Sequence, residues 1–334
     1  MFDVVILSLA EGAGPSVDAC GPAGCGGCGS DSGSDSGSDS AEKESCAAPR
    51  VPVLECADAL TKAGARVETI TAGSDAEIDA VLARFDGPPR ADGLTWPDVE
   101  NKTRLVVASA VDGQLRAVLR RLVRRYAPPP SKRPGDLATG RTVPDLPPVA
   151  LLPLDAAGTT DLAAQLGLPR TPAGVAAAVL NGPVRRLDLL RNDGGSVTVD
   201  GALVGGADDD GRAVAWRGRI EVDDKVLSDG SDPILACAIG NGGGYAEFDG
   251  LRLLTDGDPT DGRVEVAVAV PRIVKQGFRR GTKVQIEVRR ARGRAVSVLP
   301  RDGELQFLDD GVGGSMTRKR SWWTEAGAWA VYAT

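Results

Sequence analysis

Residues 105–126 read LVVASAVDGQLRAVLRRLVRRY, and this stretch decides the fold class. It opens with Leu105–Ala108, a short apolar run that is typical of a buried strand. A loop around Asp112-Gly113 follows, and the rest predicts a helix over residues 115–126, because its apolar residues recur at the helical period. A strand, a loop and a helix in this order form the repeating unit of an open, mostly parallel α/β sheet.

The same unit recurs on both sides of this stretch. Apolar and β-branched runs predict strands over residues 2–9, 66–71 and 149–152. Helices are predicted over residues 52–63, 74–85 and 161–166. The second of these helices opens with a capping box, in which Glu77 follows Ser74 by three positions. The alternation predicts an α/β domain over residues 1–168.

Residues 11–50 interrupt this domain with a low-complexity segment. It consists mainly of Gly, Ser, Asp, Ala and Pro, and it repeats GSDS three times over residues 29–40. Such a composition cannot bury enough apolar surface to offset chain entropy, so we expect a disordered insert. Four cysteines in it have the spacing C-x4-C-x2-C-x17-C, at Cys20, Cys25, Cys28 and Cys46. They could hold zinc, or they could be plain thiols of a low-complexity segment.

Beyond Gly182 the pattern changes to short alternating runs between regularly spaced turns, which predict an antiparallel β-sandwich. Strands are expected over residues 197–199, 219–222, 234–239, 263–270, 283–289, 295–298 and 304–307. One helix, over residues 171–180, is expected at the entrance, with Thr171 as its N-cap and Pro172 in its first turn. We therefore expect a β-domain over residues 169–312 and a C-terminal tail, residues 313–334, that packs back on the body.

Composition excludes several classes of function. The chain has 334 residues, enough for two domains, with 39 Lys and Arg against 46 Asp and Glu, a net charge of −7 that argues against a nucleic-acid partner. It contains no histidine, which excludes Ser-His-Asp mechanisms and histidine metal ligands and leaves carboxylates, backbone amides and oxygen-bound metals. No segment approaches the roughly 20 apolar residues of a membrane span. The start of the chain has no basic segment of an export signal, so a cytoplasmic protein is expected.

Residues 153–169, PLDAAGTTDLAAQLGLP, resemble the PLGTxNDxA and LGLP run of the diacylglycerol kinase catalytic family, which includes bacterial lipid kinases and sphingosine kinases. Other parts of the chain match in the family's order. Residues 108–115 stand where the family has its GGDGT phosphate loop and keep Asp112-Gly113. Residues 238–244 resemble the family's GN strand end, residues 258–264 its acidic DDG loop, and residues 302–304 its DGE element. The matches cover most of residues 100–310.

The resemblance implies an ATP-dependent lipid kinase that transfers the γ-phosphate to a lipid hydroxyl, with ATP and Mg²⁺ as cofactors and the site between the two domains. It implies nucleotide contacts from Asp112, Gly113, Gly158 and Thr159. Asp302 would take the proton of the lipid hydroxyl, and Glu304 would help to orient the magnesium-nucleotide. Asp161 would be a further active-site acid, and Asp258 and Asp261 would hold a structural metal.

The residues themselves leave simpler interpretations open. Asp112-Gly113 also suits an ordinary strand-to-helix turn, and Asp161 a helix cap. Residues 302–304 suit a polar hairpin turn, because Asp-Gly is a favoured turn dipeptide. Asp258 and Asp261 suit a solvated acidic turn.

The chain also departs from the family's pattern. Ala110 and Val111 replace the two loop glycines, and Gln114 replaces the threonine. Because each added side chain keeps a phosphate away from the loop backbone, a non-catalytic relative that binds nucleotide or lipid is the alternative function. An NAD kinase-type enzyme with the same core architecture is a third.

Two basic stretches stand against the overall acidity. Ten Lys and Arg residues lie between Arg272 and Arg301, against the single acid Glu287. Arg318-Lys319-Arg320 stands beside Trp322-Trp323. Cations next to indole rings suit an anionic lipid surface, which predicts a lipid substrate at the membrane surface and peripheral membrane contact. The alternative is a solvated β face whose tryptophans pack in the core.

Overall fold

The computed structural model describes residues 2–10, 51–98, 100–158, 161–208, 210–242, 247–248, 251–255, 257–276 and 281–334. The low-complexity segment, with its four cysteines and its expected disorder, lies outside these residues, as does Thr159. Cys56 and Cys237 are described, and both are buried in apolar surroundings as free thiols. Among the described helices, none is long and apolar enough to cross a bilayer.

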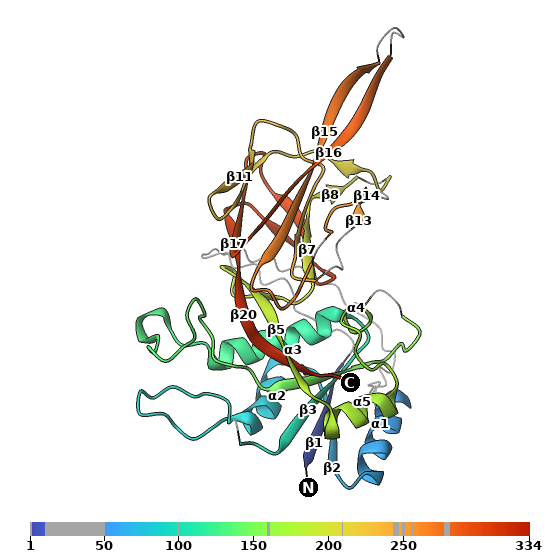
Figure 1. Cartoon of the computed structure of the whole chain (residues 1–334), viewed down its shortest axis with the longest axis vertical. Helices are drawn as coiled ribbons and strands as arrows, with labels where there is room; N and C mark the ends of the chain where they lie inside the picture. The colour runs from blue at the N-terminus through green and yellow to red at the C-terminus, as the bar shows by residue number, and fades with distance from the viewer. Residues whose placement is uncertain are drawn as a thin grey trace, which may run out of the picture.

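Four parallel strands form the first domain's sheet in the order β4-β3-β1-β2 (Figure 1). They are β1 (Asp3–Leu9), β2 (Arg66–Ala72), β3 (Thr103–Ser109) and β4 (Pro148–Pro153). β1, β3 and β4 are buried almost throughout, because helices cover both faces of the sheet. All four strands had been predicted to within two residues, because a doubly covered parallel strand is a short apolar run that sequence inspection detects well.

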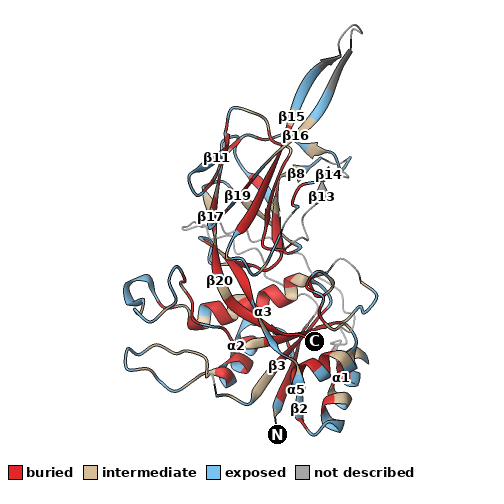
Figure 2. Cartoon of the chain, in the orientation of Figure 1, coloured by how far each residue is buried: buried red, intermediate tan, exposed pale blue. Residues whose placement is uncertain are grey.

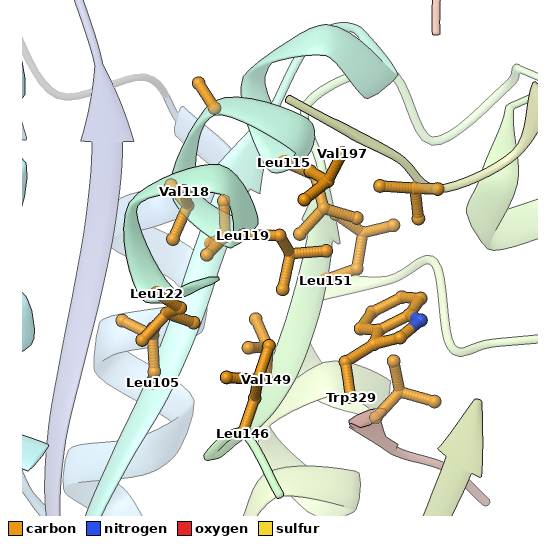
Figure 3. Close-up of a cluster of buried hydrophobic side chains, with 14 of the residues drawn as sticks. Leu105, Leu115, Val118, Leu119, Leu122, Leu146, Val149, Leu151, Val197 and Trp329 are labelled. Atoms are coloured by element: carbon orange, nitrogen blue, oxygen red, sulfur yellow. The ribbon is translucent and has the colours of Figure 1, made fainter. Parts of the chain in front are cut away.

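Helices pack on both faces of this sheet. α2 (Asp75–Leu82) and α3 (Asp112–Tyr126) contribute to an apolar core on one face. That core, which Figure 3 shows around Leu119 and Trp329, also contains side chains of β3 and β4. α1 (Val51–Lys62) and α5 (Pro172–Asn181) pack together over the opposite face. The first domain is therefore a three-layered α/β unit, as the sequence predicted.

The helix ends follow the sequence closely. Ser74 caps α2 by accepting from the N–H of Glu77, whose carboxylate in turn accepts from the N–H of Gly73. α2 ends at Leu82 and continues as the 3-10 turn η1 (Ala83–Phe85). Thr171 caps α5, with Pro172 in its first turn. α3 begins at Asp112, three residues earlier than predicted, so Asp112 lies in the helix's first turn and not in the loop.

The last strand, β20 (Arg320–Tyr332), joins the two domains into one sheet. β5 (Val184–Asn192) pairs antiparallel with it from Trp322 to Tyr332, and its C-terminal half also pairs in parallel with β4. Its N-terminal half pairs with β17 (Ala295–Pro300) of the second domain. The C-terminal segment does return to the body, but it is a central strand of a ten-stranded sheet and not a tail on its surface. β6 (Val197–Thr198) completes this sheet beside β5.

The second domain is an antiparallel β-sandwich, as expected. One of its layers is the continuation of the large sheet in β17, β10 (Gly218–Val222) and β11 (Lys225–Asp229). The other is a six-stranded sheet in the order β16-β15-β12-β7-β18-β19. Its strands are β7 (Gly201–Val204), β12 (Ala236–Gly240), β15 (Val264–Gln276), β16 (Gly281–Gly293), β18 (Leu305–Asp309) and β19 (Val312–Met316). Ile220, Val266 and Trp322 lie in the core between the layers.

Candidate functional site

A small depression lies at the carboxyl ends of β3 and β4, where the loop before α3 meets the loop before α4 (Leu162–Gln165). In open α/β sheets, ligands bind in the crevice outside the carboxyl ends of the strands. Its lining residues are Ser109, Ala110, Val111, Asp112, Leu151, Pro153 and Asp161. Asp112 and Asp161, two of the residues singled out from sequence, therefore lie in one place.

Asp112 accepts a hydrogen bond from the N–H of Leu162 at 3.2 Å, which ties the start of α3 to the start of α4. Burial, together with the nearby carboxylates of Asp200 and Asp161, raises the pKa of its carboxyl to about 6, against that hydrogen bond and the charge of Arg170. A carboxyl with a pKa this close to neutral pH can both accept and release a proton. Such perturbed groups in a crevice are typical of functional sites.

Asp161 has the opposite electrostatic environment. It is the N-cap of α4 and accepts from the N–H of Ala164 at 2.9 Å. Burial opposes its ionisation, but hydrogen bonds from Arg170 and from Ala164 outweigh burial and lower its pKa. Arg170 holds both of its oxygens and also donates to the carbonyl oxygen of Asp155 at 2.9 Å. The pair places one ionised carboxylate and one ordered guanidinium at the rim of the depression.

Gly158 makes room for this pair. A Cβ at this position would lie 3.1 Å from Nη2 of Arg170 and 3.2 Å from Oδ2 of Asp161, closer than side chains normally pack. Residue 158 is therefore glycine because a side chain here would crowd Arg170 and Asp161. The neighbouring Thr159 lies outside the described residues.

The loop before α3 takes a conformation that does not require glycine. Val111 has φ −145° and ψ 150°, an extended geometry open to any residue. Its side chain is 63% exposed at the helix N-terminus. The N–H of Ala110 donates to Oε1 of Gln114 at 2.8 Å. One loop N–H therefore already has a partner within the chain, and a valine side chain stands where a phosphate would approach the others.

Gly113 faces away from the depression, toward the second domain. A Cβ here would lie 3.0 Å from Cγ2 of Val312 and 3.3 Å from the carbonyl oxygen of Asp310. Gly113 therefore lets the turn between β18 and β19 approach the first turn of α3. In this structure its role is domain contact, while its neighbour Asp112 faces the depression.

A buried charge cluster behind this contact was missed by the sequence analysis. Arg116 of α3 donates to Asp309 at 2.8 Å and to the carbonyl oxygen of Val197 at 2.7 Å. Asp310 accepts from the N–H groups of Val199, Asp200 and Gly201 at 2.7, 2.9 and 3.1 Å. Burial raises the pKa of both aspartates.

This cluster fixes the segment that carries Asp200 beside Asp112. The sequence signal that could have found it is Asp309-Asp310-Gly311, an acidic turn at the end of β18. Arg170, the partner of Asp161, was also missed, because nothing in the sequence links it to Asp161.

The structure does not bring Asp302 and Glu304 to the depression. They lie in the exposed turn between β17 and β18, where Gly303 has φ 106°. Both line a separate cavity of about 280 Å³ that includes Trp216 and shares no residue with the depression. The period-two spacing does place them on one cavity, but that cavity belongs to the β-sandwich.

Asp258 and Asp261 already have partners in the chain. Asp258 accepts from the N–H and the hydroxyl of Thr260 at 2.9 and 2.6 Å. Asp261 accepts from the N–H of Arg263 at 2.9 Å and is paired with Arg292. A guanidinium therefore takes the place that a cation would take on Asp261. Within the described ranges, no three Cys, Asp or Glu residues are grouped as a metal would need, so the metal role of these two aspartates stays a prediction.

No protein-family model and no curated protein sequence matches the chain. Three solved structures of proteins assigned as diacylglycerol kinases from Bacillus anthracis str. Sterne align with 100% of it. Their TM-scores are 0.55, 0.59 and 0.58, at 12%, 13% and 11% identity, and the alignments cover 97%, 98% and 98% of their own chains. The chain therefore has the two-domain fold of these diacylglycerol kinases.

Proposed function

We propose that this protein is an ATP-dependent lipid kinase, which binds the nucleotide phosphates at the depression before α3 and transfers the γ-phosphate to a lipid hydroxyl. The observation that carries the proposal is Asp112, a carboxyl whose pKa is raised to about 6 at the sheet's carboxyl edge and beside Asp161. The shared fold supports the reaction class, since it is the fold of the three diacylglycerol kinases.

Phosphate binding would rest on two features of the depression. The N-terminus of α3, a helix of 15 residues, presents backbone N–H groups and the positive end of its dipole. Arg170 adds a guanidinium at the rim, held in place by Asp161. Positioning and charge neutralisation of this kind supply most of the rate in phosphoryl transfer.

The described residues contain no preformed magnesium site, because no three Cys, Asp or Glu residues are grouped as a metal would need. Asp112, Asp161 and Asp200 lie close enough for the last two to raise the pKa of the first. Such a concentration of negative charge suits a divalent cation, which proteins hold through one or two carboxylates and the substrate phosphates. Arg170 already holds both oxygens of Asp161, and Gln165 donates to Asp200, so Mg²⁺ would be held chiefly by the nucleotide phosphates with which it arrives.

Asp112 would act as the general base. The acceptor oxygen bonds to the γ-phosphorus while the bond to the β,γ-bridging oxygen breaks, and the hydroxyl proton passes to Asp112. Asp302, to which the resemblance gives this role, is the second candidate, and it would need the acceptor to span two cavities.

The second candidate function is a non-catalytic relative. Two observations favour it: Gln114 occupies the N–H of Ala110, and Val111 stands exposed at the helix end. Both reduce the N–H groups that a phosphate can reach.

Incubation of the purified full chain with γ-labelled ATP, Mg²⁺ and a mixed lipid extract tests the proposal. We expect label in a lipid product, and loss of that label in Asp112→Asn. A parallel reaction with NAD as acceptor tests the NAD kinase alternative. Absence of label from lipid and NAD, together with calorimetric binding of ATP, would establish the non-catalytic relative.

A further inference from the structure

β15 and β16 extend well beyond the sheet to which they belong (Figure 1). β12 pairs only with residues 265–269 of β15. From Pro271 outward, the described part of β15 is paired only with β16, from Pro271 opposite Ile286 to Gln276 opposite Gly281. We call residues 271–276 and 281–286 the distal hairpin; the four residues that join its strands lie outside the described part of the chain.

The distal hairpin exposes a pair of large aliphatic side chains. Ile273 lies directly opposite Val284, and they are 75% and 62% exposed. Directly opposite residues share one face of a two-stranded sheet. The same face continues toward the body through Ile286 and Val288, which pack partly against the apolar cluster around Leu253. An apolar strip thus runs from the core out onto the projecting strands, whose described outer residues are mostly exposed in Figure 2.

Such an arrangement is unfavourable in water alone. An isolated two-stranded hairpin is marginally stable, and an exposed, flat apolar hairpin invites association. Val274, on the other face, is 43% exposed as well. Since Ile273 and Val284 on one face and Val274 on the other are all exposed, these apolar side chains indicate a partner surface.

The positive charge of the distal hairpin indicates which kind of partner it binds. The distal hairpin contains Arg272, Lys275 and Lys283 and no acid. Arg272 is paired with Glu287 at 2.7 Å and with Asp232 at 3.6 Å, so the net positive charge of the distal hairpin comes from Lys275 and Lys283. This basic end belongs to a chain of net charge −7. Its charge therefore orients the hairpin, and not the rest of the molecule, toward an anionic surface.

We propose that the distal hairpin docks on an anionic lipid bilayer, with Ile273 and Val284 entering the interface and the cations of the same strands contacting lipid phosphates. Interfacial binding scales with buried apolar area plus attraction to anionic lipids, and the hairpin supplies both. A second copy of the chain would bring like charges together at this end, and a nucleic acid would leave Ile273 and Val284 exposed. The proposal goes beyond the kinase reaction, and its test needs neither nucleotide nor acceptor.

Sedimentation of the full chain with phosphatidylcholine vesicles, with and without phosphatidylserine, tests the proposal. We expect binding only to the vesicles that contain phosphatidylserine. Ile273→Asp/Val284→Asp should weaken binding by about tenfold or more, because two aliphatic side chains no longer enter the interface. Lys275→Gln/Lys283→Gln should weaken it by about fivefold for each cation removed.

The matched control is Val184→Asp/Val226→Asp, which alters two other exposed valines, on β5 and β11, at 47% and 46% exposure. We expect it to bind vesicles like the wild type. Thermal melts of Ile273→Asp/Val284→Asp and of the control should agree with the wild type, since all four substituted side chains are exposed.

Equal binding of wild type and Ile273→Asp/Val284→Asp would overturn the proposal, as would equal binding to neutral and anionic vesicles. A dimer seen by light scattering that this variant dissociates would identify a second copy as the occupant instead. Binding to a DNA duplex without binding to vesicles would identify a nucleic acid. Kinase assays decide the proposed function separately, so either proposal can fail while the other stands.

Discussion

The carboxyl of Asp112 is the group in the depression that is best suited to proton transfer. Its pKa is raised to about 6 because it is partly buried and because Asp200 and Asp161 add negative charge beside it. The ordinary value is 3.8, so the folded state favours the neutral form and its ionisation above that pH costs stability. A residue placed at such a cost is a candidate for function.

Asp112→Asn should therefore stabilise the fold at neutral pH. The cost of ionising Asp112 begins near the ordinary pKa of 3.8 and is complete above about 6. Relief of this cost should raise the free energy of unfolding by roughly 1–3 kcal/mol at pH 7, and the difference should vanish as pH falls to 4. Urea unfolding at both pH values measures it, with the exposed Asp302→Asn as control. A variant less stable than the wild type at pH 7 would contradict the assigned environment.

The loop residues before α3 give a second prediction. Ala110→Gly/Val111→Gly should tighten ATP binding, because it opens the approach to the helix N-terminus that the Val111 side chain now covers. Adding Gln114→Thr should tighten it further by releasing the N–H of Ala110. Calorimetry with Mg²⁺-ATP measures both steps. If the wild type binds tightly and neither variant gains, the side chains do not obstruct the site.

The sequence analysis found those site residues whose roles depend on their immediate neighbours along the chain. Asp112 and Asp161 each lie at the start of a helix. The order of the sequence motifs assigns both residues to one site, and the structure places them together. Other residues of the site bond to partners that lie from 9 to 193 positions away, which no local sequence pattern can reveal. They are Arg116, Arg170, Asp200, Asp309 and Asp310. Residues 302–304 were assigned to the site because they match a motif, but they line a separate cavity of the β-sandwich.

At the scale of elements, α3 links the two domains. Its first turn carries Asp112 on one side and Gly113 on the other, and one turn later Arg116 enters the β-domain. Arg116 is buried with Asp309 and Asp310, so the helix position and the β18–β19 turn depend on each other. Asp310 in that turn accepts a hydrogen bond from the N–H of Asp200.

Arg116→Leu should destabilise the protein by about 3–5 kcal/mol, because it leaves two buried carboxylates without their cation. The matched control is Arg84→Leu, which breaks an exposed pair with Glu68 and should cost about 0–1 kcal/mol. Chemical unfolding at neutral pH compares them. Equal costs would mean that the buried cluster contributes no more than a surface pair.

Helices and strands could be predicted from the sequence where a single hydrophobic period runs along the whole element. The parallel strands and the capped helices followed from apolar runs and capping residues. β20 was missed because it is interrupted by an irregularity between Glu325 and Trp329 and changes partners along its length. The outer part of β15, beyond Val270, was missed because Ile273 and Val274 are exposed and leave no buried face to mark it, whereas the strand predicted over residues 283–289 already included most of the outer part of β16.

At the scale of the whole molecule, β20 makes the two cores depend on one strand. Trp322 lies in the core of the β-sandwich, and Trp329 lies in the core beneath α3. Because loss of β20 would open both cores, we expect the chain to unfold in one cooperative step. Urea transitions followed by far-ultraviolet circular dichroism and by tryptophan fluorescence should coincide. Two separated transitions would show that the domains unfold independently.

Under the proposed function, Asp112 at the depression accepts the proton in phosphoryl transfer, and Asp302 in the β-sandwich turn does not. The most direct test is the initial rate of lipid phosphorylation by wild type, Asp112→Asn and Asp302→Asn under the same conditions. An amide cannot accept the proton, so the account predicts a loss of about 10²-fold or more in Asp112→Asn. Asp302→Asn should retain the wild-type rate. The reverse result, an active Asp112→Asn and an inactive Asp302→Asn, would contradict the account.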